Sequence, residues 1–333
     1  MSLDSVLFIP YRQTLDLLSI EDAMRVCEEV YLMHARKTVQ WSSPPSWKLD
    51  VGEPWHNHWH VKGAFLPDIP TTGVRMYNYF DDGRKNTVGS LECARYILLT
   101  NPASGHANAI IEEHWSYAIR SIAAAVLPLK WLGPTEPKVL GLVGVGTMGV
   151  NALRCLHTMY DFEKVICTSR RAKTRADFAK KWSKELDVVV EAVDTIEEVV
   201  RNADVGVGGT TSSDVVAREN WVKPGATYIS LARREMDPEG WNRFDKVVID
   251  DWDANMMNRE FVEFIEKGIF SRHELHGEIC DVVAGKIPGR ERVDERILIH
   301  TTGLVSQDIA ICHHIFQQAQ RLGLGVKLPP TDG

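Results

Sequence analysis

The chain has 333 residues, of which 44% are hydrophobic and 25% charged, the composition of a soluble globular protein with room for two domains. A formal net charge of −7 argues against a general nucleic-acid binder, because there is no basic excess to meet phosphate. No signal peptide is visible at the N-terminus, and no apolar run is long enough to span a bilayer. Six scattered cysteines without a Cys-x-x-Cys pair indicate reduced thiols in a cytoplasmic protein.

The first third of the chain predicts a mixed sheet with helices. Ser19 is followed by acidic residues and an apolar face at helical spacing, which is typical of a capped helix start. A Ser-, Pro- and Trp-rich loop is expected from about 40 to 57, and a helix from about 114 to 132 that Pro128 should kink or shorten. Turn residues separate four predicted strands, at 58–66, 73–80, 94–100 and 107–111.

From residue 138 the pattern alternates between strands and helices. This alternation predicts an α/β fold, a doubly wound parallel sheet with its ligand crevice at the carboxyl ends of the strands. A last helix, with its own apolar face, is expected from about 304 to 325 and could return to pack on the first part of the chain. The six predicted parallel strands lie at 138–143, 164–168, 187–190, 204–207, 226–231 and 246–250.

A Gly-x-Gly-x-x-Gly motif follows the first of these strands and opens a helix. Gly144 permits the tight turn, Gly146 lets a pyrophosphate approach the backbone, and Gly149 lets the helix pack close to the strand. Thr147 and Met148 lie at the helix N-terminus, whose free N–H groups favour phosphate. The fourth strand runs through Gly208 and Gly209, which either leave room for the cofactor or mark a flexible strand end. The motif predicts dinucleotide binding, with the cofactor contacts Gly144, Gly146, Thr147, Met148, Gly149, Thr210 and Thr211.

The end of the second strand bears on the choice of cofactor. An acidic residue there usually holds the ribose diol of NAD, but here the chain reads Ser169-Arg170-Arg171 with no Asp or Glu. Ser169 and Arg170 can both hydrogen-bond a phosphate, and an arginine can do so with two parallel bonds. We therefore expect NADP(H). The alternative is that these basic residues at the helix start are only solvated and that the protein binds NAD(H).

Four stretches together resemble the ornithine cyclodeaminase/μ-crystallin family. They are Gly73-Val74-Arg75, where that family usually has Gly-Val-Lys; 101–105 followed by the helix at 118–124; the glycine motif; and Thr302-Gly303 through Asp308-Ile309-Ala310. The resemblance implies a Rossmann domain of residues 123–303 inserted into a smaller α+β domain of residues 1–122 plus 304–333. It also implies that the smaller domain binds substrate and forms a homodimer. Because the family includes reductases, dehydrogenases, cyclodeaminases and a hormone-binding crystallin, fold alone does not fix the reaction.

The resemblance also implies the residues that hold the substrate, an amino, imino or keto acid. Arg120 matches the family's carboxylate-binding arginine, although it could instead form a helix-surface salt bridge. Arg75 stands where the family has lysine, so it should hold the carboxylate or polarise the imine rather than shuttle protons, unless it merely pairs with Asp81 or Asp82. Lys48 lies near a further carboxylate-binding position. Asp308 is a candidate proton donor or nicotinamide contact, or only a carboxylate stabilised by the helix dipole.

Two further observations narrow the chemistry. His56, His58 and His60 alternate along a strand but lack a convergent carboxylate set, so no metal is expected, and with Trp55 and Trp59 they could line a substrate pocket. His114 and Trp115 are likewise candidates for lining the substrate pocket rather than for binding a metal. The loop after the fifth parallel strand carries no Asp at the position that cyclodeaminases use, which disfavours cyclodeamination.

The leading hypothesis is therefore an NAD(P)H-dependent reductase of an α-imino acid, or of an α-keto acid plus an amine. In it, Arg75 and Arg120 hold the carboxylate, and Asp308 or a water supplies the proton. An NAD-dependent ammonia lyase of cyclodeaminase type and an NADP(H)-dependent binding protein like μ-crystallin are the alternatives.

Overall fold

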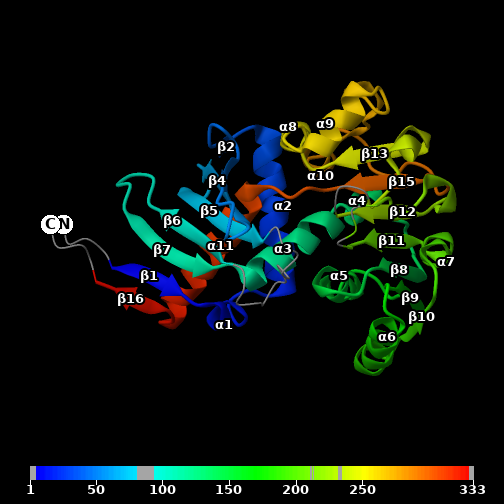
Figure 1. Ribbon diagram of the computed structural model, residues 1–333, viewed down its shortest axis with the longest axis horizontal. Helices are drawn as coiled ribbons and strands as arrows, with labels where there is room; N and C mark the ends of the chain where they lie inside the picture. The colour runs from blue at the N-terminus through cyan, green and yellow to red at the C-terminus, as the bar shows by residue number, and fades with distance from the viewer. Residues whose placement is uncertain (1–4, 81–93, 211, 213, 232–234, 330–333) are drawn as a thin grey trace. The chain divides into compact units, whose positions relative to one another are not determined.

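The computed structural model of the chain describes residues 5–80, 94–210, 212, 214–231 and 235–329. The chain divides into two compact units, the first made of Met1–Ser121 with Leu304–Gly333 and the second of Ile122–Gly303 (Figure 1). The first unit is an α+β arrangement around a mixed sheet, and the second is a parallel α/β sheet. The α/β fold class predicted from the sequence is thus confirmed. The substrate-binding and dimerisation roles of the first unit stay predictions.

The sheet of the first unit has the strand order β16-β1-β7-β6-β5-β4-β2, with β3 also paired to β4. All its pairs are antiparallel except β1 with β7. The four predicted strands are confirmed, whereas the short β2 and β3 lie in the stretch expected to be loop. The strands are β1 (Val6–Ile9), β2 (Gln40–Trp41), β3 (Trp47–Asp50), β4 (Asn57–Leu66), β5 (Thr71–Phe80), β6 (Arg95–Thr100), β7 (Ala107–Glu112) and β16 (Val326–Leu328).

Four helices accompany this sheet: α1 (Tyr11–Thr14), α2 (Ile20–Arg36), the start of α3 (His114–Val126) and α11 (Val305–Leu322). The Ser19 side chain accepts a hydrogen bond from the Asp22 N–H and caps α2, as predicted. α3 ends at Val126, and Pro128 precedes the separate short helix α4 (Leu129–Leu132), so the proline shortens the helix. α11 packs against α2 and against β4, β5 and β6, which confirms the expected return of the last helix.

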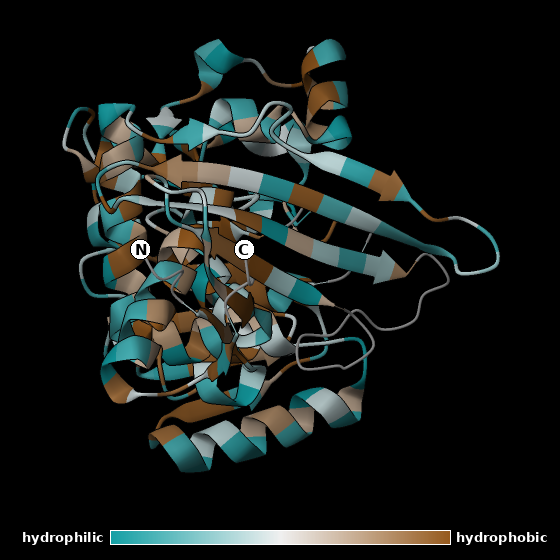
Figure 2. Ribbon diagram, turned by 90° about the vertical axis from the view of Figure 1, so that its left-hand side faces the viewer, coloured by the Kyte–Doolittle hydropathy of each residue, from teal (hydrophilic) through white to brown (hydrophobic). Residues whose placement is uncertain are grey.

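The two faces of this sheet differ in character. Along β5, the buried Arg75 and Tyr77 alternate with the exposed Val74 and Met76. Figure 2 shows the resulting bands of hydrophilic and hydrophobic residues on the long strands. A period of two is expected when successive side chains point to opposite faces. The face that carries Arg75 is therefore the buried one, which is the reverse of the usual placement of charge.

The second unit contains eight parallel strands in the order β10-β9-β8-β11-β12-β15-β13-β14. The strand order reverses between β8 and β11, the place where doubly wound sheets bind ligands. All six predicted strands are confirmed, and β14 and β15 were not predicted. The strands are β8 (Val139–Val143), β9 (Lys164–Thr168), β10 (Val189–Ala192), β11 (Val205–Gly208), β12 (Thr227–Ser230), β13 (Lys246–Ile249), β14 (Gly277–Glu278) and β15 (Ile297–His300).

Helices pack onto this parallel sheet. α5 packs against β8 and β11, α6 against β9 and β10, and α7 against β8 and β9. A core of buried aromatic side chains, including Tyr228, Trp241 and Phe270, fills the part nearest β12 and β13. The helices of the unit, besides the end of α3 and α4, are α5 (Thr147–His157), α6 (Ala172–Leu186), α7 (Ile196–Asn202), α8 (Trp252–Asn255), α9 (Arg259–Glu266), α10 (Ile279–Val283) and the 3-10 turns η1 (Glu219–Trp221), η2 (Pro238–Arg243) and η3 (Arg272–Glu274).

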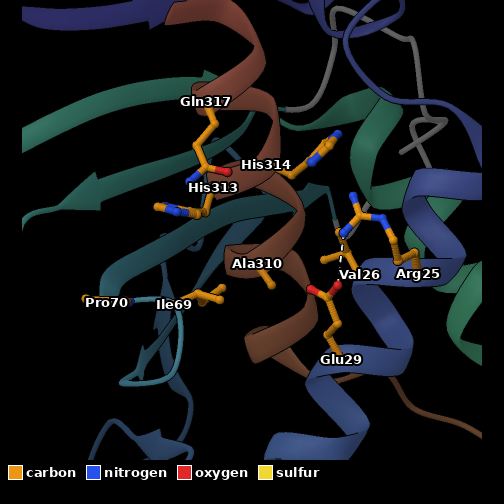
Figure 3. A pocket seen from close by; sticks show the side chains of 9 residues that line it. All are labelled: Arg25, Val26, Glu29, Ile69, Pro70, Ala310, His313, His314 and Gln317. Atoms are coloured by element: carbon orange, nitrogen blue, oxygen red, sulfur yellow. Dashed lines mark hydrogen bonds and ion pairs between the residues drawn. The ribbon is translucent and has the colours of Figure 1, made fainter. Parts of the chain in front are cut away.

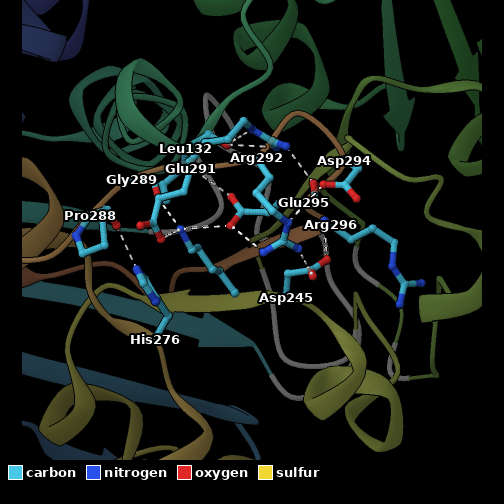
Figure 4. Close-up of polar contacts among 12 residues, drawn as sticks. Leu132, Asp245, His276, Pro288, Gly289, Glu291, Arg292, Asp294, Glu295 and Arg296 are labelled. Atoms are coloured by element: carbon cyan, nitrogen blue, oxygen red, sulfur yellow. Dashed lines mark hydrogen bonds and ion pairs between the residues drawn. The ribbon is translucent and has the colours of Figure 1, made fainter.

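A charged network, which we call the Lys246 network, fastens the segment before β15 to the rest of the second unit (Figure 4). It consists of Lys246, Arg290, Glu291 and Glu295. The Lys246 ammonium pairs with Glu291 at 2.8 Å and with the buried Glu295 at 3.2 Å, and it also donates to a backbone carbonyl. Arg290 donates to four oxygens: the carbonyls of Leu132, Gly133 and Glu295 and the hydroxyl of Thr227. The charges in this network therefore all have partners.

The structure also bears on the expected reduced thiols and on the expected lack of a membrane-spanning segment. The five described cysteines, Cys27, Cys155, Cys167, Cys280 and Cys312, are buried free thiols, and Cys93 lies outside the described residues. Among the described parts of the chain, no helix combines the length and apolar character that crossing a membrane requires. The cytoplasmic location stays a prediction.

Candidate active site

Three residues singled out in the sequence come together inside the first unit. β5 carries Arg75, α3 carries Arg120, and the first turn of α11 carries Asp308. Arg120 Nε donates to Asp308 Oδ1, and Arg75 Nη1 lies 3.5 Å from Asp308 Oδ2. All three side chains are 5% exposed or less. Arg120 therefore does not form a helix-surface salt bridge, and Asp308 has two guanidinium partners in addition to the helix N-terminus.

Glu113, which the sequence analysis did not consider, is the second acid of this group. It immediately precedes α3, and its Oε1 accepts a hydrogen bond of 2.7 Å from Arg75 Nε. Burial raises the pKa of Glu113 to about 7; the positive charge of Arg75 opposes this shift, and the negative charge of Asp308 adds to it. Arg75 stays charged, because Asp308 and Glu113 raise its pKa although burial alone would lower it. Arg75 thus pairs with Glu113 and Asp308, whereas Asp81 and Asp82 lie outside the described residues.

A third arginine, Arg95 at the start of β6, is also new. It is 1% exposed and lies opposite Tyr77 in the antiparallel pair of β5 and β6. The ring of Tyr117 is a shared neighbour, because the guanidinium carbons of Arg95, Arg75 and Arg120 lie 4.4, 4.9 and 5.4 Å from its centre. Cation–π attraction of this kind stabilises a guanidinium over an aromatic face but satisfies none of its N–H groups. We call Arg75, Arg95, Arg120, Glu113 and Asp308 the arginine cluster.

The arginine cluster has more donors than acceptors. Among the described residues, Arg75 Nη2, Arg120 Nη1 and both Nε and Nη1 of Arg95 are buried without a hydrogen-bond partner. The cluster holds three guanidinium groups against two carboxyl groups, and the raised pKa of Glu113 leaves it partly neutral near pH 7. Burial of unpaired N–H groups and of excess charge is costly. A bound anion would satisfy these donors and balance the charge.

The register of the sheet extends the cluster into a row across four strands. Lys48, His60, Tyr77 and Arg95 lie side by side on β3, β4, β5 and β6. His60 stacks on Tyr77 with 5.1 Å between ring centres and an interplanar angle of 10°. Lys48, at the outer end, is exposed and pairs with Asp50 at 2.7 Å. The structure thus places Lys48 on the same face as the cluster, but in the row of Arg95 rather than that of Arg75.

The remaining aromatic and histidine candidates separate into two groups. His58 and His60 lie on the face of Tyr77 and Tyr79, with His58 5.7 Å from the ring of Tyr79. Other candidates lie elsewhere: Trp55 and His56 are in the turn before β4, Trp59 points to the opposite face of β4, His114 packs on Tyr11, and Trp115 donates to the Leu18 carbonyl. Only His58 and His60 therefore share a face with the arginine cluster.

A separate cavity of about 360 Å³ lies between α2 and α11 in the first unit (Figure 3). Its arginine, Arg25, already pairs with Asp22 at 3.0 Å and with Glu29 at 2.9 Å. Burial lowers the pKa of His313 and of His314, which favours their neutral forms. Unlike the arginine cluster, this cavity offers no unpaired positive charge.

In the second unit, the glycine motif forms the turn between β8 and α5. Gly144 has φ +97°, and a Cβ on Gly149 would lie 2.1 Å from the Gly144 carbonyl oxygen, so the strand and helix pack closely there. A Cβ on Gly146 would meet nothing within 4 Å, so this side of the turn is open. Thr147 and Met148 begin the eleven-residue α5, whose N-terminus no side chain caps. The open backbone at a free helix N-terminus fits a pyrophosphate.

The other cofactor candidates are placed at the carboxyl ends of β9 and β11. Ser169 donates to the Arg171 carbonyl, and Arg170 is exposed just before α6. Thr210 donates from both its N–H and its hydroxyl to Glu235 Oε1. Thr211 lies outside the described residues, as do 232–234 of the loop in which the sequence has no Asp at the position expected for cyclodeaminases.

Three further residues of the second unit, Gly208, Glu235 and Asp237, have mainly structural surroundings. A Cβ on Gly208 would come within 2.7 Å of Glu235 and of Tyr228, so this glycine makes room for protein side chains. Asp237 caps η2, and Glu235 accepts hydrogen bonds from Thr210. The one group of described residues with ligand atoms close enough for a metal ion is Glu278, Cys280 and Asp281, which does not include the three histidines.

The chain was compared with known families and proteins. A model of the ornithine cyclodeaminase/mu-crystallin family matches residues 49–322. Among curated relatives, the iminosuccinate reductase of Paracoccus denitrificans is 28% identical over 276 residues, which are 79% of this chain and 82% of that one.

Two solved structures have the same fold as this chain. The Δ(1)-pyrroline-2-carboxylate reductase of Thermococcus litoralis, in complex with NADH and L-proline, superposes with a TM-score of 0.87 at 22% identity, covering 97% of this chain and 100% of that one. An archaeal alanine dehydrogenase dimer with bound NAD gives 0.86 at 24% identity, covering 98% and 99%. At these identities the likeness establishes the fold and not the substrate.

Proposed function

This chain belongs to the ornithine cyclodeaminase/mu-crystallin family, and we propose that it is an NAD(P)H-dependent reductase of an α-imino acid. The imine is either preformed or made from an α-keto acid and an amine. Relatives with the names of imine reductases and amino-acid dehydrogenases support this class of reaction. Their names differ in the side chain of the substrate: alanine carries one carboxylate and succinate two. The comparisons therefore leave the substrate open within the class.

The arginine cluster is the observation that carries this proposal. Arg120 Nη1 and Arg75 Nη2 are buried donors with no partner in the described parts of the chain, and two guanidinium groups can hold a carboxylate in a fixed position and plane. Arg75 is also close enough to its acids to remain a fixed positive charge, so it orients and polarises rather than transferring protons. We assign Arg75 and Arg120 to the α-carboxylate of the substrate.

The turn from Gly144 to Gly149 would hold the pyrophosphate of a dinucleotide at the N-terminus of α5. When bound, reduced NAD(P) supplies the hydride that the imine carbon accepts. Arg170 and Ser169 would contact the adenosine ribose, where an exposed arginine in place of an acid favours the 2′-phosphate of NADP(H). NADH-bound and NAD-bound relatives support the nicotinamide cofactor but not the choice between the two forms.

Reduction of an imine also places a proton on its nitrogen. Glu113 is the acid best suited to hold that proton, because burial raises its pKa to about 7 and its Oε2 has no partner among the described residues. Asp308 accepts from Arg120 and lies beside Arg75, so it contacts two guanidinium groups where Glu113 accepts from one, and it holds the two arginines in place. We therefore assign the proton to Glu113 and the positioning role to Asp308.

The face of the first sheet opposite the arginine cluster supports a homodimer. Trp47, Val61, Met76 and Tyr96 form one row across β3, β4, β5 and β6, and Val74 lies beside Met76 on the same face. Trp47 is 50% and Met76 42% exposed, and such contiguous apolar surface is typical of an interface. An exposed apolar sheet face of this kind fits a second copy of the same chain.

The dimer can be tested by light scattering after size-exclusion chromatography. Met76→Glu should give a monomer, whereas Val293→Glu, at an 89% exposed site in the second unit, should leave the dimer intact. A wild-type monomer at micromolar concentration would contradict the dimer.

The reaction itself is tested by loss of reduced-cofactor absorbance with purified protein. NADPH and NADH are offered separately with cyclic imino acids, and with glyoxylate, pyruvate and oxaloacetate, each paired with ammonia or methylamine. Turnover with an imine supports the proposal, and a preference for NADPH supports the role of Arg170. Ammonia release from ornithine with NAD, without any imine reduction, would instead show a cyclodeaminase.

A further inference from the structure

Arg95 is a buried cation that the proposed holding of one carboxylate does not use. It is 1% exposed, it forms no ion pair with any described residue, and two of its three nitrogens have no hydrogen-bond partner there. Its surroundings are the faces of Tyr77, Tyr79 and Tyr117, at 5.4, 5.3 and 4.4 Å from the guanidinium carbon. Tyrosine rings can attract the positive charge, but they leave the planar set of N–H donors free.

The position of Arg95 relative to the other arginines identifies what those donors could bind. Arg95 and Arg75 share Tyr77 and Tyr117 as neighbours, on adjacent strands of one sheet face. One oxygen of each acid of the cluster is held by another arginine, because Glu113 Oε1 accepts from Arg75 Nε and Asp308 Oδ1 from Arg120 Nε. Among the described residues no carboxylate pairs with Arg95, so its free N–H donors are open to an anionic ligand.

We propose that the substrate carries a second carboxylate, and that Arg95 binds it while Arg75 and Arg120 hold the carboxylate next to the imine carbon. This inference rests on the proposed function and names the substrate class within it: an imino dicarboxylate. The row of side chains runs from the buried Arg95 through Tyr77 and His60 to the exposed Lys48. These cationic and aromatic side chains line the surroundings of the second carboxylate. Two parallel hydrogen bonds from Arg95 to the second carboxylate would select both the length and the charge of the substrate.

The test compares substrates that have the same shape and differ in charge. Oxaloacetate is paired with 4-methyl-2-oxopentanoate, and 2-oxoglutarate with 5-methyl-2-oxohexanoate, each with methylamine and the preferred reduced cofactor. The wild type should prefer the dicarboxylate of at least one pair by about 100-fold in kcat/KM, since an unpaired buried charge is costly on both sides. Arg95→Met should remove that preference, because it lowers kcat/KM for the dicarboxylate far more than for the uncharged isostere.

Two control variants separate substrate binding from a structural role. Arg95→Lys keeps the charge and should retain part of the preference, mainly through a raised KM. Arg25→Met, which removes an exposed arginine of the same unit, should leave kcat/KM unchanged for both members of each substrate pair. If the wild type reduces both members of each pair equally well, or if Arg95→Met slows both equally, Arg95 only supports the tyrosines and the inference is overturned while the proposed function stands.

A protein that reduces none of these acids would contradict the proposed function, and the inference is then judged by binding alone. Isothermal titration with aspartate, glutamate and leucine would show whether the wild type selects an amino acid with two carboxylates. Selective binding of aspartate or glutamate that Arg95→Met abolishes would uphold the distal carboxylate site. Equal affinity for leucine, or no binding of any of the three, would overturn it.

Discussion

Arg290 in the second unit is a half-buried arginine and Arg95 in the first is a buried one, and their surroundings differ in one respect. Arg290 donates to four oxygens of the chain, and the neighbouring Lys246 has two carboxylate partners. Arg95 has three tyrosine rings and, among the described residues, no acceptor for two of its nitrogens. A fully paired buried charge holds the fold together, whereas an unpaired one keeps its donors available for a ligand.

The difference teaches how to divide buried charges between stability and function. Removing one member of the Lys246 network takes a counter-charge away from its partner, so the loss appears in the free energy of unfolding. Some N–H donors of the arginine cluster have no partner among the described residues, and removing one of them leaves no other group unpaired in the free protein. The loss therefore appears in substrate binding. The four predictions below separate these two outcomes.

The largest effect on stability is expected for Lys246→Met. Glu295, whose side chain is 1% exposed, would lose its closest cation and keep only the more distant, exposed Arg292, and removing one partner of a buried ion pair costs about 3–5 kcal/mol. Urea denaturation should show this loss, while kcat/KM per folded molecule stays unchanged. Arg292→Met is the matched control, because Arg292 is 57% exposed and lies 3.6 Å from the same carboxylate, so it should cost less than about 1 kcal/mol. Equal losses in both variants would contradict the structural reading of the network.

In the arginine cluster, Arg120→Lys should lower kcat/KM by about 100-fold, because lysine keeps the charge beside Asp308 but cannot grip a carboxylate with two parallel bonds. The midpoint of urea denaturation should shift far less than in Lys246→Met. Arg25→Lys, at the exposed end of an ion-pair trio, is the control and should leave kcat/KM unchanged. A large loss of stability with unchanged kcat/KM would assign Arg120 to the fold instead of the substrate.

The sequence predicted the parallel sheet well because each of its strands is set by local information. Apolar runs, glycine turns and helix caps lie within a few residues of one another, and six strands of the second unit followed from them. β14 has only two residues and carries no such signal. β15 is an apolar run that enters the sheet between β12 and β13, and nothing in the residues just before it repeats the preceding strand–helix pattern.

The candidate site was harder to predict because its members meet only through tertiary structure. Arg75, Arg120 and Asp308 were found from short motifs of a family, but Glu113 and Arg95 belong to no motif. Their contacts depend on the register of β5 with β6 and on the packing of α11 against the sheet. One sequence signal existed: Arg75, Tyr77 and Tyr79 alternate along one strand, which predicts a polar row on a single face.

The pH dependence of stability offers a smaller test within the cluster. Burial raises the pKa of Glu113 from its ordinary 4.5 to about 7, with Arg75, Arg95 and Asp308 as the charged groups that face it. A group with a raised pKa in the folded state stabilises below its unfolded pKa, and this contribution is lost as pH rises through the folded pKa. The difference in unfolding free energy between the wild type and Glu113→Gln should therefore fall between about pH 4.5 and 7. A difference that is flat, or that rises with pH, would contradict a protonated Glu113 in the folded protein.

Arg170 tests the limit of the comparison, because it is an arginine without an ion-pair partner among the described residues but lies at the surface. Water satisfies an exposed guanidinium, so a missing partner there indicates much less than it does for Arg95. Arg170→Ala should lower kcat/KM with NADPH by about tenfold and leave NADH unaffected, as expected for one charge-assisted contact to a 2′-phosphate. Arg171→Ala, one residue further on, is the control and should change the NADPH-to-NADH ratio less. If Arg170→Ala leaves that ratio unchanged, the NADP(H) preference fails. The assignment of the buried arginines stands, because their evidence is buried N–H donors without partners among the described residues and not charge alone.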